Sequence, residues 1–265
     1  MGEAKRRDRN IGQCIYCGAT AGLTREHVMP YGLGGDLVLK DASCSTCANE
    51  TSKLELRLLR GHWWPYRRFL GLPSRRSGET VPDLPVTVLQ ANGTSLSANL
   101  PMEKQSVALV FEFDPPSILS GTMRDDVPNA PRVYMKNLAP FPSVVQVAGV
   151  DYKLQSDEKL NIPVAFDAAD LCRFLAKVAH GYAISRGGLN YCSSFVLPPV
   201  ILGQTRGAQS YVGGISSPLI GSRLPGSGLH AMMDRVNNGF RTVYIQLFRD
   251  RGDPPPIYEV VVGHV

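Results

Sequence analysis

The hydrophobic and polar positions of residues 14–61 predict a short strand, a loop and a helix. The strand ends near residue 27, and a Pro- and Gly-rich loop follows through residue 35. A helical pattern then begins near residue 47 and ends at Gly61, because glycine readily adopts the conformation that terminates a helix. At about 100° of rotation per residue, one side of this helix is polar. That side comprises Asn49, Lys53, Arg57 and Arg60.

Beyond residue 85 the pattern changes to strands and one long helix. Residues 86–98 predict a hairpin that turns at Asn92-Gly93, a dipeptide suited to the positive φ angles of a tight turn. Residues 167–186 predict the helix, with Asp167 as its N-cap. We expect this helix to cover a mostly antiparallel sheet. Further strands are expected at residues 107–113, 143–150, 195–203, 210–214, 241–249 and 257–263.

Composition places the chain among globular proteins with a sizeable core. Of its 265 residues, 43% are hydrophobic and 19% are charged. No apolar run approaches the roughly 18 residues that a membrane span needs. The first ten residues carry charge without a following apolar run, so we do not expect a secretory signal. These features exclude membrane-spanning and collagen-like classes. They favour a cytoplasmic protein of bacterial type that has no membrane partner.

The positive charge of the chain is concentrated in its first quarter. Residues 1–76 contain thirteen Lys or Arg and seven Asp or Glu, whereas the other 189 residues contain fifteen and sixteen. The whole excess that gives the net charge of +5 therefore lies in residues 1–76. Such an asymmetry is typical of a module that binds a polyanion, although basic tails also serve solubility.

Four of the six cysteines form two C-x2-C pairs. Cys14 and Cys17 are separated by 26 residues from Cys44 and Cys47. In a reducing compartment such pairs hold metal more often than they form disulfides, and two pairs complete the tetrahedral thiolate set of structural zinc. The alternative interpretation is four unrelated buried or redox thiols. The remaining cysteines, Cys172 and Cys192, are expected to be ordinary buried thiols.

The residues around these pairs resemble a known family. The stretches CIYCG, LTREHVMPYGLGG, ASCSTC and ETSKLE are similar to the zinc-stapled branch of the HNH endonucleases, whose fold is a β-hairpin plus helix that grips a catalytic metal. The resemblance covers residues 14–60. It implies that His27 is the general base and that Glu26 holds a catalytic divalent ion, Mg²⁺ or a similar one. It also implies a second ligand from the helix after the second cysteine pair.

The second ligand is assigned to Asn49. Many family members have His or Asn directly after the last cysteine, whereas this chain has Ala48 there and Asn49 next. The rivals on the same helix are Glu50, Thr51 and Glu55. The family's middle Asn, which braces the loop, is absent, and the acids that could replace it are Asp36 and Asp41.

These residue types suit phosphodiester hydrolysis on chemical grounds. An imidazole has an unperturbed pKa near neutrality, so His27 could deprotonate water. A hard cation held by an oxygen ligand could neutralise charge on the phosphoryl group. Neighbouring strand residues point to opposite faces, so Glu26 and His27 could share a site only with a local irregularity. The loop at Pro30 and Gly32 could supply that irregularity.

Basic side chains near this site are expected to contact phosphates without reading sequence. These predicted nucleic-acid-binding residues are Arg25, Lys53, Arg57, Arg60, Arg67 and Arg68. Trp63 and Trp64 lie beside the last two, and we favour a role in the small domain's core over base stacking. His180 has no acid or cysteine at ligand spacing and is expected to be structural.

The sequence therefore predicts a metal-dependent HNH-type endonuclease acting on DNA, with RNA not excluded. The alternative is a catalytically inactive, zinc-stabilised nucleic-acid-binding or regulatory protein on the same scaffold. The predicted class is α+β, with a small ββα-metal zinc domain ahead of an α+β domain. The expected units are a basic tail at 1–10, the zinc domain at 11–70, a linker at 71–85 and the α+β domain at 86–265, whose role is open.

Overall fold

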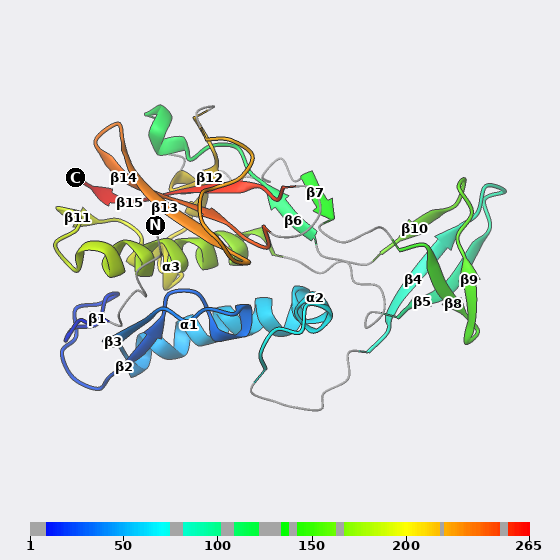
Figure 1. Ribbon diagram of the computed structural model, residues 1–265, viewed down its shortest axis with the longest axis horizontal. Helices are drawn as coiled ribbons and strands as arrows, with labels where there is room; N and C mark the ends of the chain where they lie inside the picture. Colours follow the sequence, from blue (N-terminus) through cyan, green and yellow to red (C-terminus); the bar gives the residue numbers. More distant parts are fainter. Residues whose placement is uncertain are drawn as a thin grey trace.

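A computed structural model gives the arrangement of most of the chain. It describes residues 9–74, 82–101, 109–121, 134–137, 142–162, 167–217, 220–249 and 254–265. Residues 1–8 of the predicted tail and residues 75–81 of the predicted linker lie outside the described residues. The predicted class is confirmed: the protein is α+β, its sheets are mostly antiparallel, and one helix is long (Figure 1).

The N-terminal module is a β-hairpin followed by a helix. Strand β2 (Leu23–His27) pairs antiparallel with β3 (Val38–Cys44), and a single 3-10 turn, η1 (Tyr31–Leu33), lies in the loop between them. Strand β1 (Arg9–Asn10) pairs with β3 in parallel, so the end of the predicted tail belongs to this sheet. Helix α1 (Ser45–Arg57) follows directly, then a π-helical turn, η2 (Leu58–His62), and helix α2 (Trp64–Phe69).

Helix α3 (Ala168–Gly187) lies at the centre of the molecule. The carboxylate of Asp167 accepts a hydrogen bond from the amide of Ala169 at 2.8 Å, which confirms the predicted N-cap. Almost every residue from Leu171 to Ile184 is buried, so this part of the helix is covered on all sides. Figure 1 shows why: the N-terminal module lies on one side of α3 and the C-terminal sheet on the other.

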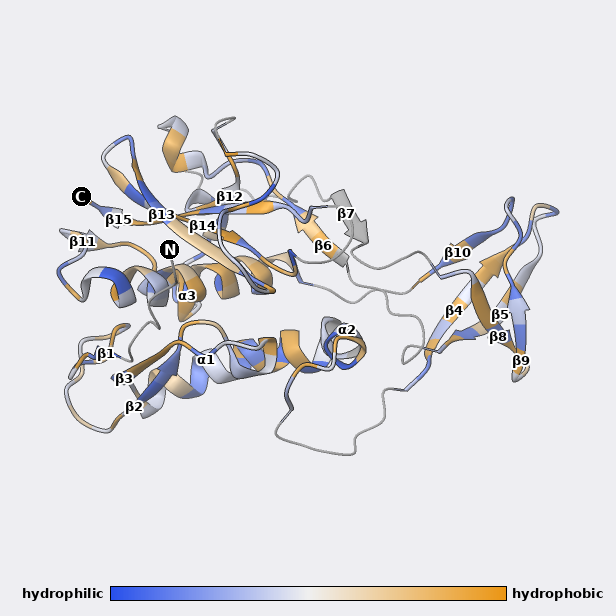
Figure 2. Ribbon diagram, viewed as in Figure 1, coloured by the Kyte–Doolittle hydropathy of each residue, from blue (hydrophilic) through white to orange (hydrophobic). Residues whose placement is uncertain are grey.

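The C-terminal sheet has the strand order β11-β15-β14-β13, with β12 also paired to β15. The strands are β11 (Ser194–Phe195), β12 (Val212–Gly214), β13 (Ala231–Asn237), β14 (Phe240–Gln246) and β15 (Ile257–His264). Strands β14 and β15 pair antiparallel and correspond to the strands expected at residues 241–249 and 257–263. Figure 2 shows apolar residues along α3 and along these strands, where the two layers meet. A 3-10 turn, η4 (Ala208–Ser210), leads into β12.

A separate sheet lies at the far end of the molecule in Figure 1, with the order β10-β4-β5-β8-β9. The strands are β4 (Leu84–Leu89), β5 (Ser95–Leu100), β8 (Val144–Val147), β9 (Val150–Lys153) and β10 (Lys159–Asn161). The β4–β5 turn contains Gly93 at φ +83°, as the Asn92-Gly93 pattern predicts. Strands β6 (Leu109–Glu112) and β7 (Tyr134–Asn137) form a two-stranded sheet, and η3 (Ser117–Ser120) follows β6.

Two sequence expectations about single elements differ from the structure. Residues 143–150 form β8 and the start of β9 instead of one strand, because Ala148 and Gly149 both take positive φ and turn the chain. Residues 195–203 contain helix α4 (Pro198–Ile201) in place of a continuous strand. Proline at the start of a helix loses no hydrogen bond, whereas in a strand it removes one from the ladder.

The hydrophobic core joins the two ends of the chain. One cluster of buried side chains includes the cysteine-pair region, Trp63, α3 and the C-terminal sheet. A second cluster fills the separate sheet and comprises Val86, Val88, Ala98, Leu100 and Val145. The buried side chains of residues 11–70 therefore do not form a core separate from that of residues 86–265. The predicted boundary, as a statement about independently folding units, stays a prediction.

Candidate metal centre and the ion cluster at Glu26

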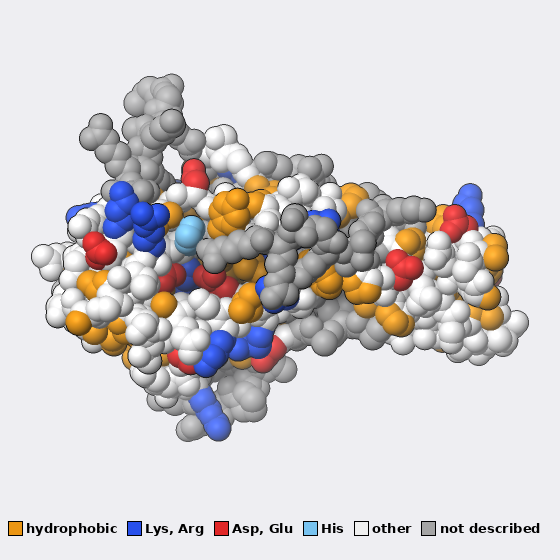
Figure 3. Space-filling view, turned by 90° about the horizontal axis from the view of Figure 1, so that it is seen from below, with side chains coloured by type: hydrophobic (Ala, Val, Ile, Leu, Met, Phe, Trp, Pro, Cys, Tyr) orange, Lys and Arg blue, Asp and Glu red, His pale blue; other side chains and the backbone are white. Residues whose placement is uncertain are grey.

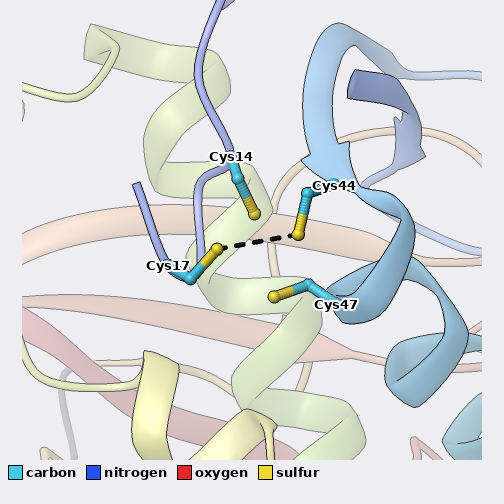
Figure 4. Close-up of side chains that lie close together, drawn as sticks. All are labelled: Cys14, Cys17, Cys44 and Cys47. Carbon is cyan, nitrogen blue, oxygen red and sulfur yellow. Dashed lines mark hydrogen bonds between the residues drawn. The ribbon is translucent and has the colours of Figure 1, made fainter. Parts of the chain in front are cut away.

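Two tight turns bring the four paired cysteines together. Cys14 and Cys17 lie in the loop before β2, where the amide of Gly18 donates to the carbonyl of Cys14 at 2.9 Å. Gly18 has φ +78°, a conformation that side chains disfavour. Cys44 ends β3 and Cys47 lies in the first turn of α1. Figure 4 shows the four sulfur atoms pointing toward one another from these two places.

The distances between the sulfur atoms suit one tetrahedral metal ion. All four lie within 4.8 Å of one another, and the Sγ atoms of Cys17 and Cys44 are 3.6 Å apart. A disulfide requires about 2.05 Å, whereas a zinc–thiolate tetrahedron with bonds of about 2.3 Å has sulfur–sulfur edges of about 3.8 Å. All four cysteines are free thiols, and three of them are buried. The donor set therefore fits structural zinc, as the cysteine spacing predicts.

The start of α1 favours the thiolate form at Cys44. The backbone amide of Cys47 hydrogen-bonds to the Cys44 sulfur and lowers the pKa of that thiol to about 7. Burial raises the pKa of the Cys47 thiol, so the cysteines differ in how readily they lose a proton. Metal ligands of this kind must be deprotonated, and Cys44 is the one poised to bind the ion as a thiolate near neutral pH.

Glu26, the predicted ligand of a catalytic ion, is instead paired with a lysine. Its Oε1 atom lies 2.7 Å from Nζ of Lys177, which also lies 2.8 Å from Oε1 of Glu55. The same ammonium donates to the backbone carbonyl of His27. We call Glu26, Glu55 and Lys177 the ion cluster. Burial disfavours the ammonium, but the two carboxylates outweigh that effect and raise the pKa of Lys177 above its ordinary value.

Glu26 and His27 do not share a face of β2. The β2–β3 ladder is in register at both residues, with Glu26 opposite Leu39 and His27 opposite Val38, and its irregularity lies upstream, after Thr24. A regular ladder sends neighbouring side chains to opposite faces. The exposures differ accordingly, since Glu26 is 5% exposed and His27 is half-buried. The irregularity expected at the Pro30 and Gly32 loop does not bring the two side chains together.

The helix residues proposed as second metal ligands occupy different environments. Asn49 is exposed, and Thr51 is buried with its hydroxyl donating to the carbonyl of Cys47 at 3.2 Å. Glu50 pairs with Lys53 on the surface at 2.8 Å. Glu55 is the one that reaches Glu26, through Lys177. Among the described residues, the four cysteines are the only group of three or more His, Cys, Asp or Glu ligands placed to hold one ion.

The predicted nucleic-acid-binding residues divide into exposed and structural ones. Five of them are exposed, namely Arg25, Lys53, Arg57, Arg60 and Arg68. Among these, Arg57 forms a two-bond ion pair with Asp170 at the start of α3, with nitrogen–oxygen distances of 2.5 and 2.7 Å. Figure 3 shows this side of the molecule, where Lys and Arg side chains lie around a hollow that contains acidic side chains and a histidine.

Arg67 has a structural position. It is buried, and its guanidinium donates to the backbone carbonyls of Gly32, Leu59 and Pro73. These bonds tie the loop after β2 to α2 and occupy the donors that a phosphate would need. Trp63 is also buried and meets Phe174 of α3 edge to face at 5.2 Å, which agrees with the core role preferred for it.

Lys177 is the site residue that the sequence did not reveal. It lies 150 residues from His27 in the chain, so no motif connects them. One signal was present: Lys177 sits within the nearly continuous apolar and small-residue stretch of α3. A lysine in a fully buried helix requires an acidic partner. His180, one turn later, is buried and bonds to the carbonyl of Ile15 at 2.7 Å, which fits the structural role expected of it.

Comparison of this chain with known protein families, curated proteins and solved structures finds no match. Among the described residues, no helix is long and apolar enough to cross a bilayer.

Proposed function

We propose that Cys14, Cys17, Cys44 and Cys47 hold a single structural zinc ion. The support is the convergence of four free thiols within 4.8 Å of one another. The ion would fasten the loop before β2 to the junction of β3 and α1. It would thereby fix the hairpin against the helix.

We further propose that the protein is an endonuclease of the HNH type that hydrolyses phosphodiester bonds in nucleic acid, with DNA as the expected substrate. The observation that carries this proposal is the β-hairpin and helix pinned by the cysteine cluster, with His27 at the end of β2. In this position His27 is half-buried. Its imidazole would accept a proton from the attacking water, a role that histidine side chains commonly serve in catalysis.

The exposed basic side chains would hold the substrate. Arg25 lies on β2 beside the proposed site, and Arg60 and Arg68 follow along the continuation of α1 and on α2. Contacts of this kind are made to phosphates, so they give affinity that falls with salt and little sequence preference. They also cannot distinguish DNA from RNA, because they do not read the 2′-hydroxyl.

A catalytic divalent ion does not fit the residues assigned to it. Glu26 is engaged with Lys177, and Asn49 is exposed while Glu26 is buried. No step of the proposed mechanism therefore uses an ion at Glu26.

The deciding experiment is a supercoiled-plasmid assay with the zinc-loaded protein in Mg²⁺, in Mn²⁺ and in EDTA. His27→Ala should abolish cleavage while zinc content stays unchanged. His264→Ala is the matched control, because His264 is an exposed histidine at the end of β15. Cleavage that survives His27→Ala in a preparation as pure as the wild type would overturn the assignment of the base.

The second candidate is a zinc-stabilised nucleic-acid-binding protein without catalysis. The ion pair between Glu26 and Lys177 favours it, since a nuclease site is expected to keep its acidic residue available to an ion. This candidate predicts salt-sensitive binding of DNA or RNA and no cleavage in any of the metals. The same assay therefore separates the two.

A further inference from the structure

We propose that the ammonium group of Lys177 takes the place of a divalent cation at Glu26, so that this chain carries a built-in cation where a nuclease of this type would bind a metal. The inference concerns the cation site alone and holds whether or not the chain cleaves nucleic acid.

The surroundings of Lys177 Nζ are those of a cation site. Its three neighbours are Oε1 of Glu26 at 2.7 Å, Oε1 of Glu55 at 2.8 Å and the backbone carbonyl of His27. Carboxylates and a backbone carbonyl are the ligands that hard divalent cations take in proteins. An ammonium has three protons, and here each of them has an acceptor. The hydrogen-bonding capacity of Lys177 is therefore filled by these oxygens.

The cluster is closed to solvent on the side of the lysine. The side chains of Lys177, Glu26 and Glu55 are 1%, 7% and 21% exposed. An ammonium buried to this extent is stable only when paired, and removal of the lysine leaves two carboxylates without a cation, whereas removal of Glu26 leaves Lys177 paired with Glu55. A divalent ion bound to the same two carboxylates would lie beside the ammonium, where like charges repel. The lysine and a metal ion are therefore alternatives at this place.

The built-in cation also joins distant parts of the chain. Glu26 comes from β2, Glu55 from the last turn of α1 and Lys177 from the middle of α3. A metal ion would connect only the first two. The C-terminal segment is thus a structural component of the Glu26 site, which explains why Glu26 can stay buried within the N-terminal module.

The test is a titration of the zinc-loaded, full-length chain with Mn²⁺, with free Mn²⁺ followed by electron paramagnetic resonance. Glu26→Gln should leave the Mn²⁺ binding of the otherwise wild-type chain unchanged. Lys177→Ala should create a single new Mn²⁺ site, because two carboxylates lose their cation. This site should bind Mn²⁺ about tenfold or more tightly than any site of the wild-type protein. The double variant Lys177→Ala with Glu26→Gln should lose that site again.

Lys53→Ala is the matched control, because it removes another lysine that lies 2.8 Å from a glutamate but is exposed. It should bind Mn²⁺ as the wild type does. Wild-type Mn²⁺ binding that disappears in Glu26→Gln would overturn the proposal, and so would a folded Lys177→Ala protein without a new site. If Lys177→Ala does not fold, as judged by near-UV circular dichroism, the comparison of wild type with Glu26→Gln decides alone. Whether the protein cleaves nucleic acid tests the role of His27 and does not test this proposal about the cation site.

Discussion

His180 in the middle of α3 is hydrogen-bonded to Ile15 in the first cysteine turn. The ring nitrogen Nε2 lies 2.7 Å from the carbonyl of Ile15, and the ring stacks on Tyr16 at 5.8 Å between centroids. The amide of Ile15 in turn donates to the carbonyl of Ala42 in β3 at 2.8 Å. The cysteine turn is therefore held by its own sheet and by a helix more than 150 residues away.

Removal of zinc should consequently destabilise more than the cysteine region. A structural zinc ion contributes on the order of 10 kcal/mol in small modules, which is comparable to the whole stability of a typical domain. With chelator, we expect β2, β3, α1 and α3 to lose protection from amide hydrogen exchange together. The β4–β5 hairpin, which has its own hydrophobic cluster, should keep its protection.

Cysteine variants give the control for that experiment. Cys44→Ser should lose zinc, whereas Cys192→Ser, a buried cysteine outside the cluster, should retain it. If α3 stayed protected while residues 14–60 opened, the two regions would be independent units, as the boundary at residues 71–85 implies.

The ion cluster should show strong coupling between its members. Lys177→Met leaves Glu26 buried without a partner and is expected to lower the free energy of unfolding by about 3–5 kcal/mol. Adding Glu26→Gln should recover part of this loss, because the unpaired charge is removed together with its partner. Urea denaturation of the two single variants and the double variant measures the coupling. Additive effects would contradict a direct ion pair.

The candidate site shows where sequence reasoning succeeds and where it ends. The C-x2-C spacing, the Asn92-Gly93 turn and the Asp167 cap are local, so a few neighbouring residues determine their geometry. The pairing of Glu26 with Lys177 is not local, and it depends on how α3 lies against the hairpin. The shared core is not local either, because it joins residues of the N-terminal module to α3 and the C-terminal sheet. Residues 82–101 and 142–162 form a separate sheet with its own hydrophobic cluster, and the pattern of residues 86–265 does not mark this division.

Arg67 and Arg68 are neighbours in the sequence but should behave in opposite ways. Arg67→Ala removes donors from three backbone carbonyls and is expected to cost about 2–4 kcal/mol of stability, since bonds from charged groups are the stronger ones. Arg68→Ala should leave stability within about 0.5 kcal/mol. If Arg68 contacts a phosphate, its loss should weaken nucleic-acid binding and reduce the salt slope by about one. Thermal unfolding and binding at several salt concentrations separate the two effects.

The arrangement around His230 predicts that acid weakens the fold. Burial lowers the pKa of His230 to about 4, although its hydrogen bond to the carbonyl of Leu33, at 2.9 Å, opposes part of that shift. The other ring nitrogen, Nδ1, accepts from the amide of Phe248 at 3.3 Å, which is possible only in the neutral ring. The contact with Leu33 holds the loop after β2 against the C-terminal segment, and the contact with Phe248 fixes the ring within that segment.

The direction in which stability changes with pH follows from how many protons His230 binds in the folded and in the unfolded state. An unfolded histidine takes up its proton near pH 6.5 and the folded one only near pH 4. Between these values the unfolded state binds more protons, so stability is complete above about pH 6.5 and falls as the pH approaches 4. The contribution of His230 is at most about 3 kcal/mol. His230→Phe should reduce the slope of unfolding free energy against pH in this window, whereas His264→Phe, an exposed histidine, should not. Equal slopes in the wild type and in His230→Phe would show that the ring takes up its proton at the same pH in the folded and unfolded protein, which would contradict the prediction.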